Sequence, residues 1–212
     1  KHVKNFVVQT KSMRSILKAN FYINAKVLPL VPNFNLLKKD VESNFDESQF
    51  DFVYIASGDP HKNHKNLIYA WIELSKSGIH PSLCLTIDNS TYFELCDWIS
   101  TISKKYSLNV ENYGVIKHSK ALSLYKQSKA LIFPSFFESF GLPLVEASFL
   151  NLPIIASELD YVRDIVSLTQ SFDPSSSTSI ARAVRRYLNN PEDFVQQVDV
   201  NAFINTIIAD NA

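Results

Sequence analysis

Short apolar runs alternate with longer segments of helical periodicity along most of this 212-residue chain. The apolar runs have the length of buried strands, and turn residues or helical patterns follow them. This alternation favours parallel strands, because parallel neighbours need a crossover long enough to hold a helix. Such crossovers are right-handed, and in a doubly wound sheet they place helices on both faces. The sequence therefore predicts an α/β fold with a Rossmann-like, doubly wound parallel sheet.

The predicted elements follow one another with short connections. Strands are predicted at residues 6–10, 26–31, 52–57, 83–88, 110–115, 130–134 and 153–157. Helices are predicted at residues 11–20, 65–77, 91–106, 119–128, 142–150, 159–166, 177–189 and about 192–209. The polar segment 32–48 separates a short strand–helix–strand piece from the main series, so we expect a domain boundary there.

The composition is that of a globular domain with a real core, since 46% of the residues are hydrophobic and 20% are charged. The 21 Lys and Arg residues balance the 21 Asp and Glu residues. Nucleic-acid binding needs clustered basic charge, so no nucleic-acid partner is expected. No apolar run approaches the ~20 residues that a membrane-spanning helix needs.

Cysteine and histidine usage gives no sign of a disulfide framework or a metal centre. Cys84 and Cys96 have no disulfide-like spacing and are expected to be thiols in a reducing compartment, the cytoplasm. His61 and His64 lie three apart, but no third ligand is near them in the sequence. We therefore expect neither a metal nor another cofactor.

Two glutamates with seven residues between them flank the predicted start of a helix. Glu138 lies in the loop after an expected strand, and Glu146 lies inside the helix 142–150. Gly141 lets the backbone come close to a ligand, and Pro143 suits the first turn of a helix. A helix start attracts phosphate, whereas carboxylates suit hydroxyl groups. The combination fits a ligand that carries both, such as a nucleotide sugar.

This stretch resembles the E-x7-E signature of the retaining GT-B glycosyltransferases of group 1, also called family 4. Residues 125–135 resemble the helix and strand that lead to the motif, 152–157 the next strand, and 172–174 a late turn. The resemblance runs from about residue 52 to residue 190. It implies the C-terminal, donor-binding half of a GT-B enzyme, in which two Rossmann domains face each other across a cleft.

The resemblance divides the chain into three parts. Residues 1–34 are expected to be a remnant of the N-terminal acceptor domain with the interdomain linker. Residues 35–190 are expected to form the Rossmann-like domain that binds the nucleotide sugar, and residues 191–212 a C-terminal helix. Because the body of the acceptor domain is missing, we expect these 212 residues to bind nucleotide but to be inactive or nearly so alone.

The resemblance also assigns roles around the two glutamates. Glu138 would face the donor sugar and the reacting region as a catalytic residue, and Glu146 would accept hydrogen bonds from the ribose hydroxyls. Backbone N–H groups between them would contact sugar and phosphate: those of Ser139, Phe140, Gly141 and Leu142. The alternative is that both acids only complement the helix dipole, worth about 0.3–1 kcal/mol each.

A loop after the first strand of the main series would hold the diphosphate. The resemblance makes Lys62 the catalytic cation of this loop, which also includes the donor-binding residues Ser57 and Gly58. The family usually carries an arginine at the position of Ser57. The phosphate clamp would therefore have one cation fewer, unless His61 or Lys65 substitutes.

Gly114, Val115 and Ile116 close another predicted strand and resemble the segment that lies along the nucleotide base. Backbone groups there would read a base edge. Gly58, Gly114 and Gly141 all fall just after or at the end of expected strands, at the edge where doubly wound sheets bind ligands. The alternative is that these glycines serve turn geometry alone.

The resemblance implies transfer of a sugar, with retention, from a UDP- or GDP-sugar to a hydroxyl of a sugar, lipid-linked or glycan acceptor. No metal is required for this reaction. Polysaccharide or glycoconjugate biosynthesis would be its setting, in the cytoplasm or at the inner face of the cell membrane, with peripheral membrane association through the N-terminal domain. Two alternatives stay open: a nucleotide-binding module without transfer activity, which Ser57 favours, and a GT-B-fold UDP-sugar epimerase.

Overall fold

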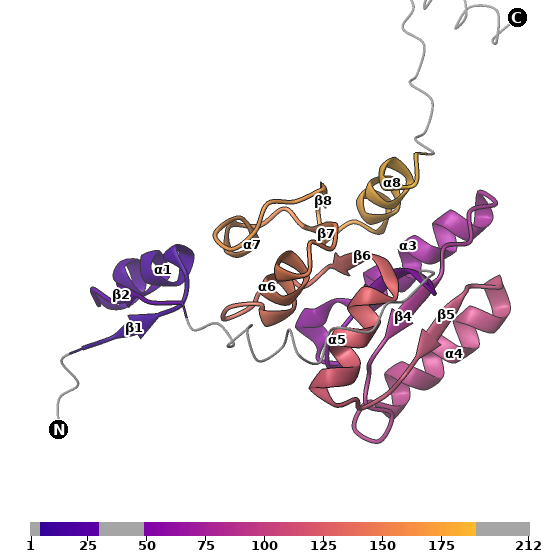
Figure 1. Cartoon of the computed structure of the whole chain (residues 1–212), viewed down its shortest axis with the longest axis horizontal. Helices are drawn as coiled ribbons and strands as arrows, with labels where there is room; N and C mark the ends of the chain where they lie inside the picture. Colours follow the sequence, from indigo (N-terminus) through magenta and orange to yellow (C-terminus); the bar gives the residue numbers. More distant parts are fainter. Residues whose placement is uncertain (1–4, 30–48, 190–212) are drawn as a thin grey trace, which may run out of the picture.

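The computed structural model describes residues 5–29 and 49–189. Its main body is a six-stranded parallel sheet with the order β5-β4-β3-β6-β7-β8 (Figure 1). The strands are β3 (Phe50–Tyr54), β4 (Leu83–Leu85), β5 (Val110–Asn112), β6 (Ser128–Phe133), β7 (Ile154–Ser157) and β8 (Gln170–Phe172). The chain moves outward from β3 to β5, returns to β6 beside β3, and moves outward again to β8. The predicted doubly wound sheet is confirmed, and its topological switch point lies between β3 and β6.

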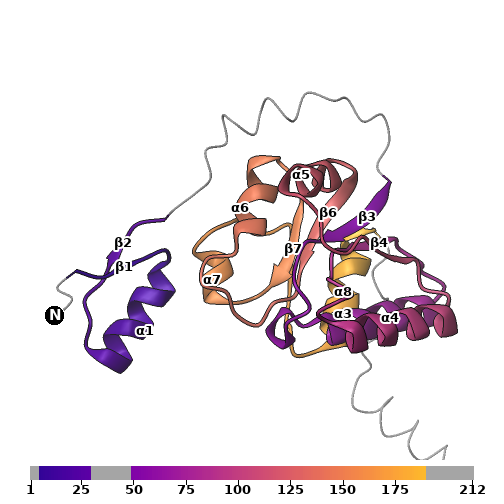
Figure 2. The ribbon, with the colours of Figure 1, turned by 90° about the horizontal axis from the view of Figure 1, so that it is seen from below.

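Helices cover both faces of this sheet. Figure 2 shows α3, α4 and α8 on one side, and α5 and α6 on the other. A further short helix, α7, lies in the crossover from β7 to β8. The helices are α3 (His64–Lys76), α4 (Phe93–Tyr106), α5 (His118–Lys126), α6 (Leu142–Phe149), α7 (Asp160–Arg163) and α8 (Ser177–Tyr187).

The central strands β3 and β6 are buried on both faces. Val53 and Leu131 are register partners, and both are completely inaccessible to solvent. Every residue of β6 except Lys129 is buried. Because helices cover both sides, such a strand needs apolar residues at successive positions rather than at alternate ones. This is why the sequence predicts both strands, although β3 spans Phe50–Tyr54 rather than the predicted residues 52–57.

A smaller unit precedes the sheet. Strands β1 (Val7–Val8) and β2 (Lys26–Val27) pair in parallel, and α1 (Lys11–Phe21) forms their crossover. The predicted strand–helix–strand piece is therefore present. The N–H and the hydroxyl of Ser12 both donate to Asp164 Oδ2, each over 2.6 Å, and these bonds join the unit to the main body.

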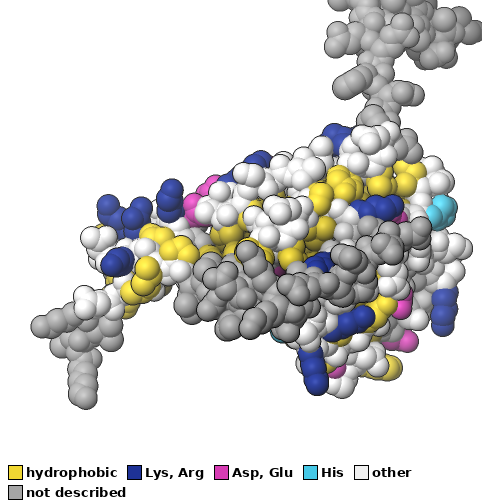
Figure 3. Space-filling view, viewed as in Figure 1, with side chains coloured by type: hydrophobic (Ala, Val, Ile, Leu, Met, Phe, Trp, Pro, Cys, Tyr) yellow, Lys and Arg dark blue, Asp and Glu magenta, His cyan; other side chains and the backbone are white. Residues whose placement is uncertain are grey.

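Helix α1 is a surface helix with a basic face. Lys and Arg side chains gather over it in Figure 3, where α1 contributes Lys11, Arg14 and Lys18. None of its residues is buried. Across the described residues, no helix has both the length and the apolar composition that crossing a bilayer requires.

The edge strand β8 is the main element that the sequence does not predict. Only a late turn is expected at residues 172–174, yet residues 170–172 pair with β7. Gln170 and Ser171 are only half-buried, because β8 lies at the edge of the sheet. An edge strand of this kind has no continuous apolar run to mark it.

Other elements are shorter than expected. The helix predicted at 159–166 is regular only over Asp160–Arg163, since Ile165 N–H already donates to Val162 O in a tighter i+3 turn. The strand predicted at 110–115 ends at Asn112. The predicted boundary near residue 34 and the predicted helix 191–212 lie outside the described residues.

Candidate functional site at the switch point of the sheet

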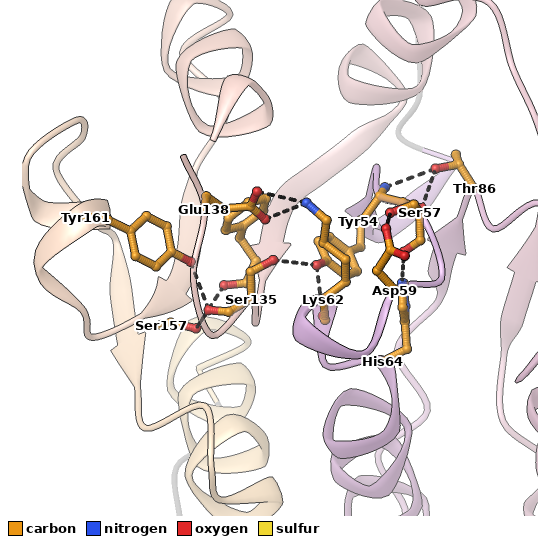
Figure 4. A network of polar contacts seen from close by, with 12 residues as sticks. Tyr54, Ser57, Asp59, Lys62, His64, Thr86, Ser135, Glu138, Ser157 and Tyr161 are labelled. Atoms are coloured by element: carbon orange, nitrogen blue, oxygen red, sulfur yellow. Dashed lines mark hydrogen bonds and ion pairs between the residues drawn. The ribbon is translucent and has the colours of Figure 1, made fainter. Parts of the chain in front are cut away.

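The loops that follow β3 and β6 meet at the switch point, as Figure 4 shows. The buried hydroxyl of Tyr54 donates to Lys62 O over 2.9 Å and is hydrogen-bonded to Ser135 Oγ over 2.8 Å. The N–H of Phe136 donates to His61 O over 2.9 Å. The two loops are therefore held against each other by bonds between residues far apart in the sequence.

Asn63 fixes the start of α3 in the same place. Its backbone is left-handed, with φ of 63°, a conformation that asparagine tolerates better than most residues. Its buried side-chain amide donates to Pro134 O over 3.0 Å and to Pro174 O over 2.7 Å. One side chain thus connects the loop after β3 with the segments that follow β6 and β8.

Lys62 and Glu138, the two residues predicted to be catalytic, are in direct contact. Lys62 Nζ lies 2.6 Å from one carboxylate oxygen of Glu138 and 2.8 Å from the other. The side chains are 18% and 11% exposed, so solvent screens this ion pair only in part. The structure therefore brings together a cation and an anion that the sequence separates by 76 positions.

The start of α6 follows Glu138 by a few residues in the chain. Gly141 has φ of +80°, and a Cβ there would lie 3.1 Å from Leu144 Cδ1. Pro143 has no N–H, and Leu144 N–H turns back to Gly141 O over 2.9 Å. The N–H of Leu142 and those of the loop before it are the remaining candidates for a ligand. Ser139 and Leu142 are exposed, whereas the side chain of Phe140 is buried and only its backbone could take part.

Ser57 and Gly58 belong to a second group of polar contacts in the loop after β3. Ser57 Oγ donates to Asp59 Oδ2 over 2.6 Å, and the Tyr92 hydroxyl donates to Asp59 Oδ1 over 2.9 Å. These two hydrogen bonds, from Ser57 first, lower the pKa of Asp59. A Cβ on Gly58 would lie only 2.4 Å from Tyr92 Cγ, so only glycine fits beside this ring. The position expected to hold an arginine thus supports a carboxylate instead.

His64, the first residue of α3, holds the backbone of the same loop. Its buried imidazole bonds Ser57 O through Nε2 over 2.8 Å, and burial lowers the pKa of His64 to about 4. The ring is therefore neutral at pH 7, with the Nε2 hydrogen donated to the carbonyl. Neutral His64 acts on the backbone of the loop and supplies no charge for a phosphate.

Glu146 lies in a separate environment, between α5 and α6. The residue is only 6% exposed. One carboxylate oxygen is 2.7 Å from His118 Nε2, and the other accepts a hydrogen bond of 3.1 Å from the Tyr125 hydroxyl. The structure therefore joins Glu146 to α5, the helix that follows the predicted base-contacting segment.

That segment lies at the same carboxyl edge of the sheet. Gly114 has φ of +67°, and its N–H donates to Asn112 Oδ1 over 3.3 Å. Val115 is 77% exposed, and Ile116 packs partly against the core. These three residues thus follow the strand end and precede His118 closely in the chain, and Val115 is the most exposed of them.

A cleft of about 980 Å³ opens on the other side of Glu138. One wall is formed by α1 together with Thr10, and the other by the loop after β6 and by α7. Phe136, Phe137, Glu138 and Ser139 all line it. Two of the predicted site residues, Glu138 and Ser139, therefore border a cavity that is large enough for a substrate.

Asp59, Tyr92, His118 and Tyr125 are site residues that the sequence does not predict. Tyr92, His118 and Tyr125 act through partners that are distant in sequence, whereas Asp59 lies in the predicted diphosphate loop and bonds Ser57, two positions away. His61 stacks on Phe137, with ring centroids 4.5 Å apart, and Lys65 is exposed at the start of α3. Whether either replaces the usual arginine stays a prediction. Among the described residues no group of three or more His, Cys, Asp or Glu side chains could hold a metal ion.

The sequence pattern of the glycosyl transferases of group 1 matches residues 37–202. The chain belongs to this family. The serotype-specific mannosyltransferase WbdA of Escherichia coli is 28% identical to it over 141 residues, which are 65% of this chain and 17% of WbdA. The match thus spans about a sixth of the length of that relative.

Two solved structures have the same fold. The glycosyltransferase from Rickettsia africae superimposes with a TM-score of 0.75 at 15% identity, over 88% of this chain and 53% of that one. HepE of Anabaena, solved with UDP and glucose, superimposes with a TM-score of 0.67 at 15% identity, over 88% of this chain and 54% of HepE. At this level of identity the likeness shows the α/β fold of the GT-B glycosyltransferases.

Proposed function

We propose that this chain is the donor-binding part of a retaining glycosyltransferase. The enzyme would move a sugar from a UDP- or GDP-sugar to a hydroxyl of a sugar, lipid-linked or glycan acceptor. The observation that carries the proposal is the Lys62–Glu138 contact of 2.6 Å across the switch point, next in the chain to the start of α6. In doubly wound sheets this is where ligands bind. The presence of UDP and glucose in the HepE structure supports the same assignment.

Lys62 would stabilise the leaving group. When the bond between the sugar and the diphosphate breaks, negative charge develops on the departing nucleoside diphosphate. An ammonium group that is already in place lowers the energy of that charge, and so do N–H groups at Gly141 and Leu142. Since protein groups supply this stabilisation, the proposed reaction needs no metal.

Glu138 would exchange partners when the donor binds. In the structure its carboxylate pairs with Lys62. A diphosphate offers Lys62 stronger negative charge, and Glu138 can then accept hydrogen bonds from the sugar hydroxyls. Its role would be to orient the sugar rather than to attack it. In a same-face, retaining transfer the leaving phosphate would help to take the proton of the acceptor hydroxyl.

The remaining parts of the donor have separate places. The ribose hydroxyls would bond Glu146, and Gly114, Val115 and Ile116 would lie along the base. The acceptor would enter the cleft of about 980 Å³ between α1 and the loop after β6. We place the activity in polysaccharide or glycoconjugate synthesis, in the cytoplasm or at the inner face of the cell membrane.

Calorimetry with UDP and GDP tests the proposal directly. One of them should bind, and at 100 times its dissociation constant it should stabilise the fold by about 2.7 kcal/mol. The transfer assay uses a full-length parent protein that includes the acceptor domain. Release of that nucleotide from its sugar donor, together with a new glycosidic bond in the acceptor, would distinguish a transferase from a binding module. An interconverted UDP-sugar would instead indicate the epimerase. If neither UDP nor GDP binds, the proposed function is wrong.

A further inference from the structure

The carboxylate of Glu146 is held by two donors, one on each oxygen. Tyr125, which is completely buried at the end of α5, bonds Oε2. His118, the first residue of α5, bonds Oε1. A carboxylate accepts only, so the imidazole must present its Nε2 hydrogen to it. Both donors come from one helix, and together they fix the carboxylate of another.

The two donors differ in their access to solvent. Tyr125 closes the inner side of the carboxylate, whereas the side chain of His118 is 50% exposed. Glu146 itself is 8% exposed in its side chain, so His118 lies on the solvent side of a nearly buried acid. His118 is therefore the solvent-exposed donor of the pair.

The number of hydrogen bonds is also informative. An ionised carboxylate offers about four acceptor positions, two on each oxygen. Tyr125 and His118 use one position on each oxygen, which leaves about two for a ligand. Two adjacent hydroxyl groups, as on a ribose, match this remaining capacity. His118 also follows the candidate base-contacting segment by two residues, so base and ribose would be read at neighbouring points.

We propose that His118 is a positioning residue that holds Glu146 in the orientation that recognises the ribose diol of the donor nucleotide. This inference rests on the proposed function, because it assumes that a nucleotide occupies the site. A glutamate side chain loses rotational freedom when it is ordered, and His118 orders it before the ligand arrives. The consequence is selectivity for ribonucleotides over nucleotides that lack the diol.

The test compares UDP and GDP with their 2′,3′-dideoxy analogues by calorimetry on the 212-residue chain. The wild-type chain should bind the ribonucleotide at least tenfold more tightly, as expected for two hydrogen bonds to a charged group. His118→Ala should weaken the ribonucleotide about tenfold and leave the dideoxy analogue unchanged. His118→Gln, which keeps an N–H near the position of Nε2, should retain most of the preference. His80→Ala changes an exposed histidine between α3 and β4 and is the matched control.

Each result leads to a different conclusion. If His118→Ala weakens both ligands equally, His118 has only a structural role, and the inference is wrong while the proposed function stands. Equal binding of the two ligands by the wild-type chain would mean that Glu146 does not read the diol, which also overturns the inference. If the wild-type chain binds no nucleotide, the proposed function fails and the inference fails with it. Circular dichroism and Tm of each variant confirm that it is folded.

Discussion

The two glutamates of one short motif lie in different chemical environments. Glu138 pairs with a cation, Lys62, in the mostly buried region where the loops after β3 and β6 meet. Glu146 is held from both sides by His118 and Tyr125 between two helices. The partner of Glu138 is an ammonium group that could bind an anionic ligand instead. One partner of Glu146, Tyr125, is a completely buried hydroxyl.

This difference suggests a division of tasks within the site. The Lys62–Glu138 region would respond to the charge and the sugar of the donor by exchanging partners. The Glu146 region would provide a rigid reading of the nucleoside. A motif with the same residue type at both ends can thus supply an adaptable contact and a preorganised one, because the surroundings of each carboxylate differ.

Removal of the cation should have the largest effect. Lys62→Met deletes the charge proposed to hold the diphosphate, and charge-assisted hydrogen bonds are worth about 1.5–3 kcal/mol. We expect UDP or GDP affinity to fall about 10- to 100-fold, measured by calorimetry. The preference for the ribonucleotide over its dideoxy analogue should persist, since Glu146 is untouched.

Lys76→Met is the matched control for this variant. Lys76 is exposed at the last position of α3, the helix that follows Lys62, so its loss changes the net charge equally. If Lys76→Met weakens nucleotide binding as much as Lys62→Met, the effect is general electrostatics. An unchanged affinity in Lys62→Met would mean that the phosphates bind elsewhere.

Acid should destabilise the Lys62–Glu138 region through His64. The pKa of His64 is lowered to about 4 by burial, whereas the unfolded chain takes up this proton near pH 6.5. The unfolded state therefore binds more protons between these values, so stability is complete above pH 6.5 and falls as the pH drops towards 4. At pH 5 the loss from this group is about 2 kcal/mol.

Denaturant unfolding of the wild-type chain and of His64→Gln at pH 7.5 and pH 5 measures this effect. Glutamine keeps an N–H for Ser57 O but does not titrate. The wild-type chain should lose about 2 kcal/mol more than the variant between the two values. Equal losses would show that His64 does not control the acid sensitivity, and that other groups do.

The sequence predicts the fold and the motif, but not the support around the motif. Parallel strands buried on both faces leave continuous apolar runs, and Lys62 and Glu138 can be found because a helix start and a known spacing mark them. The edge strand β8 lacks such a run. Tyr92 and His118 act through contacts over 33 and 28 positions, which no local pattern encodes.

The smallest predicted effect has an unusual direction and separates the two glutamates most clearly. Glu138→Gln keeps the shape of the side chain but no longer competes with the diphosphate for Lys62. UDP or GDP should therefore bind about fivefold more tightly, which corresponds to the ~1 kcal/mol of a partly exposed ion pair.

Glu146→Gln should instead weaken binding, because it removes a charged acceptor from the ribose. In the Lys62→Met background the gain from Glu138→Gln should vanish. Calorimetry on the wild type, Lys62→Met, Glu138→Gln and the double variant gives the coupling energy between Lys62 and Glu138. If both glutamine variants weaken UDP alike, the two carboxylates do the same work and the contrast drawn between them is wrong.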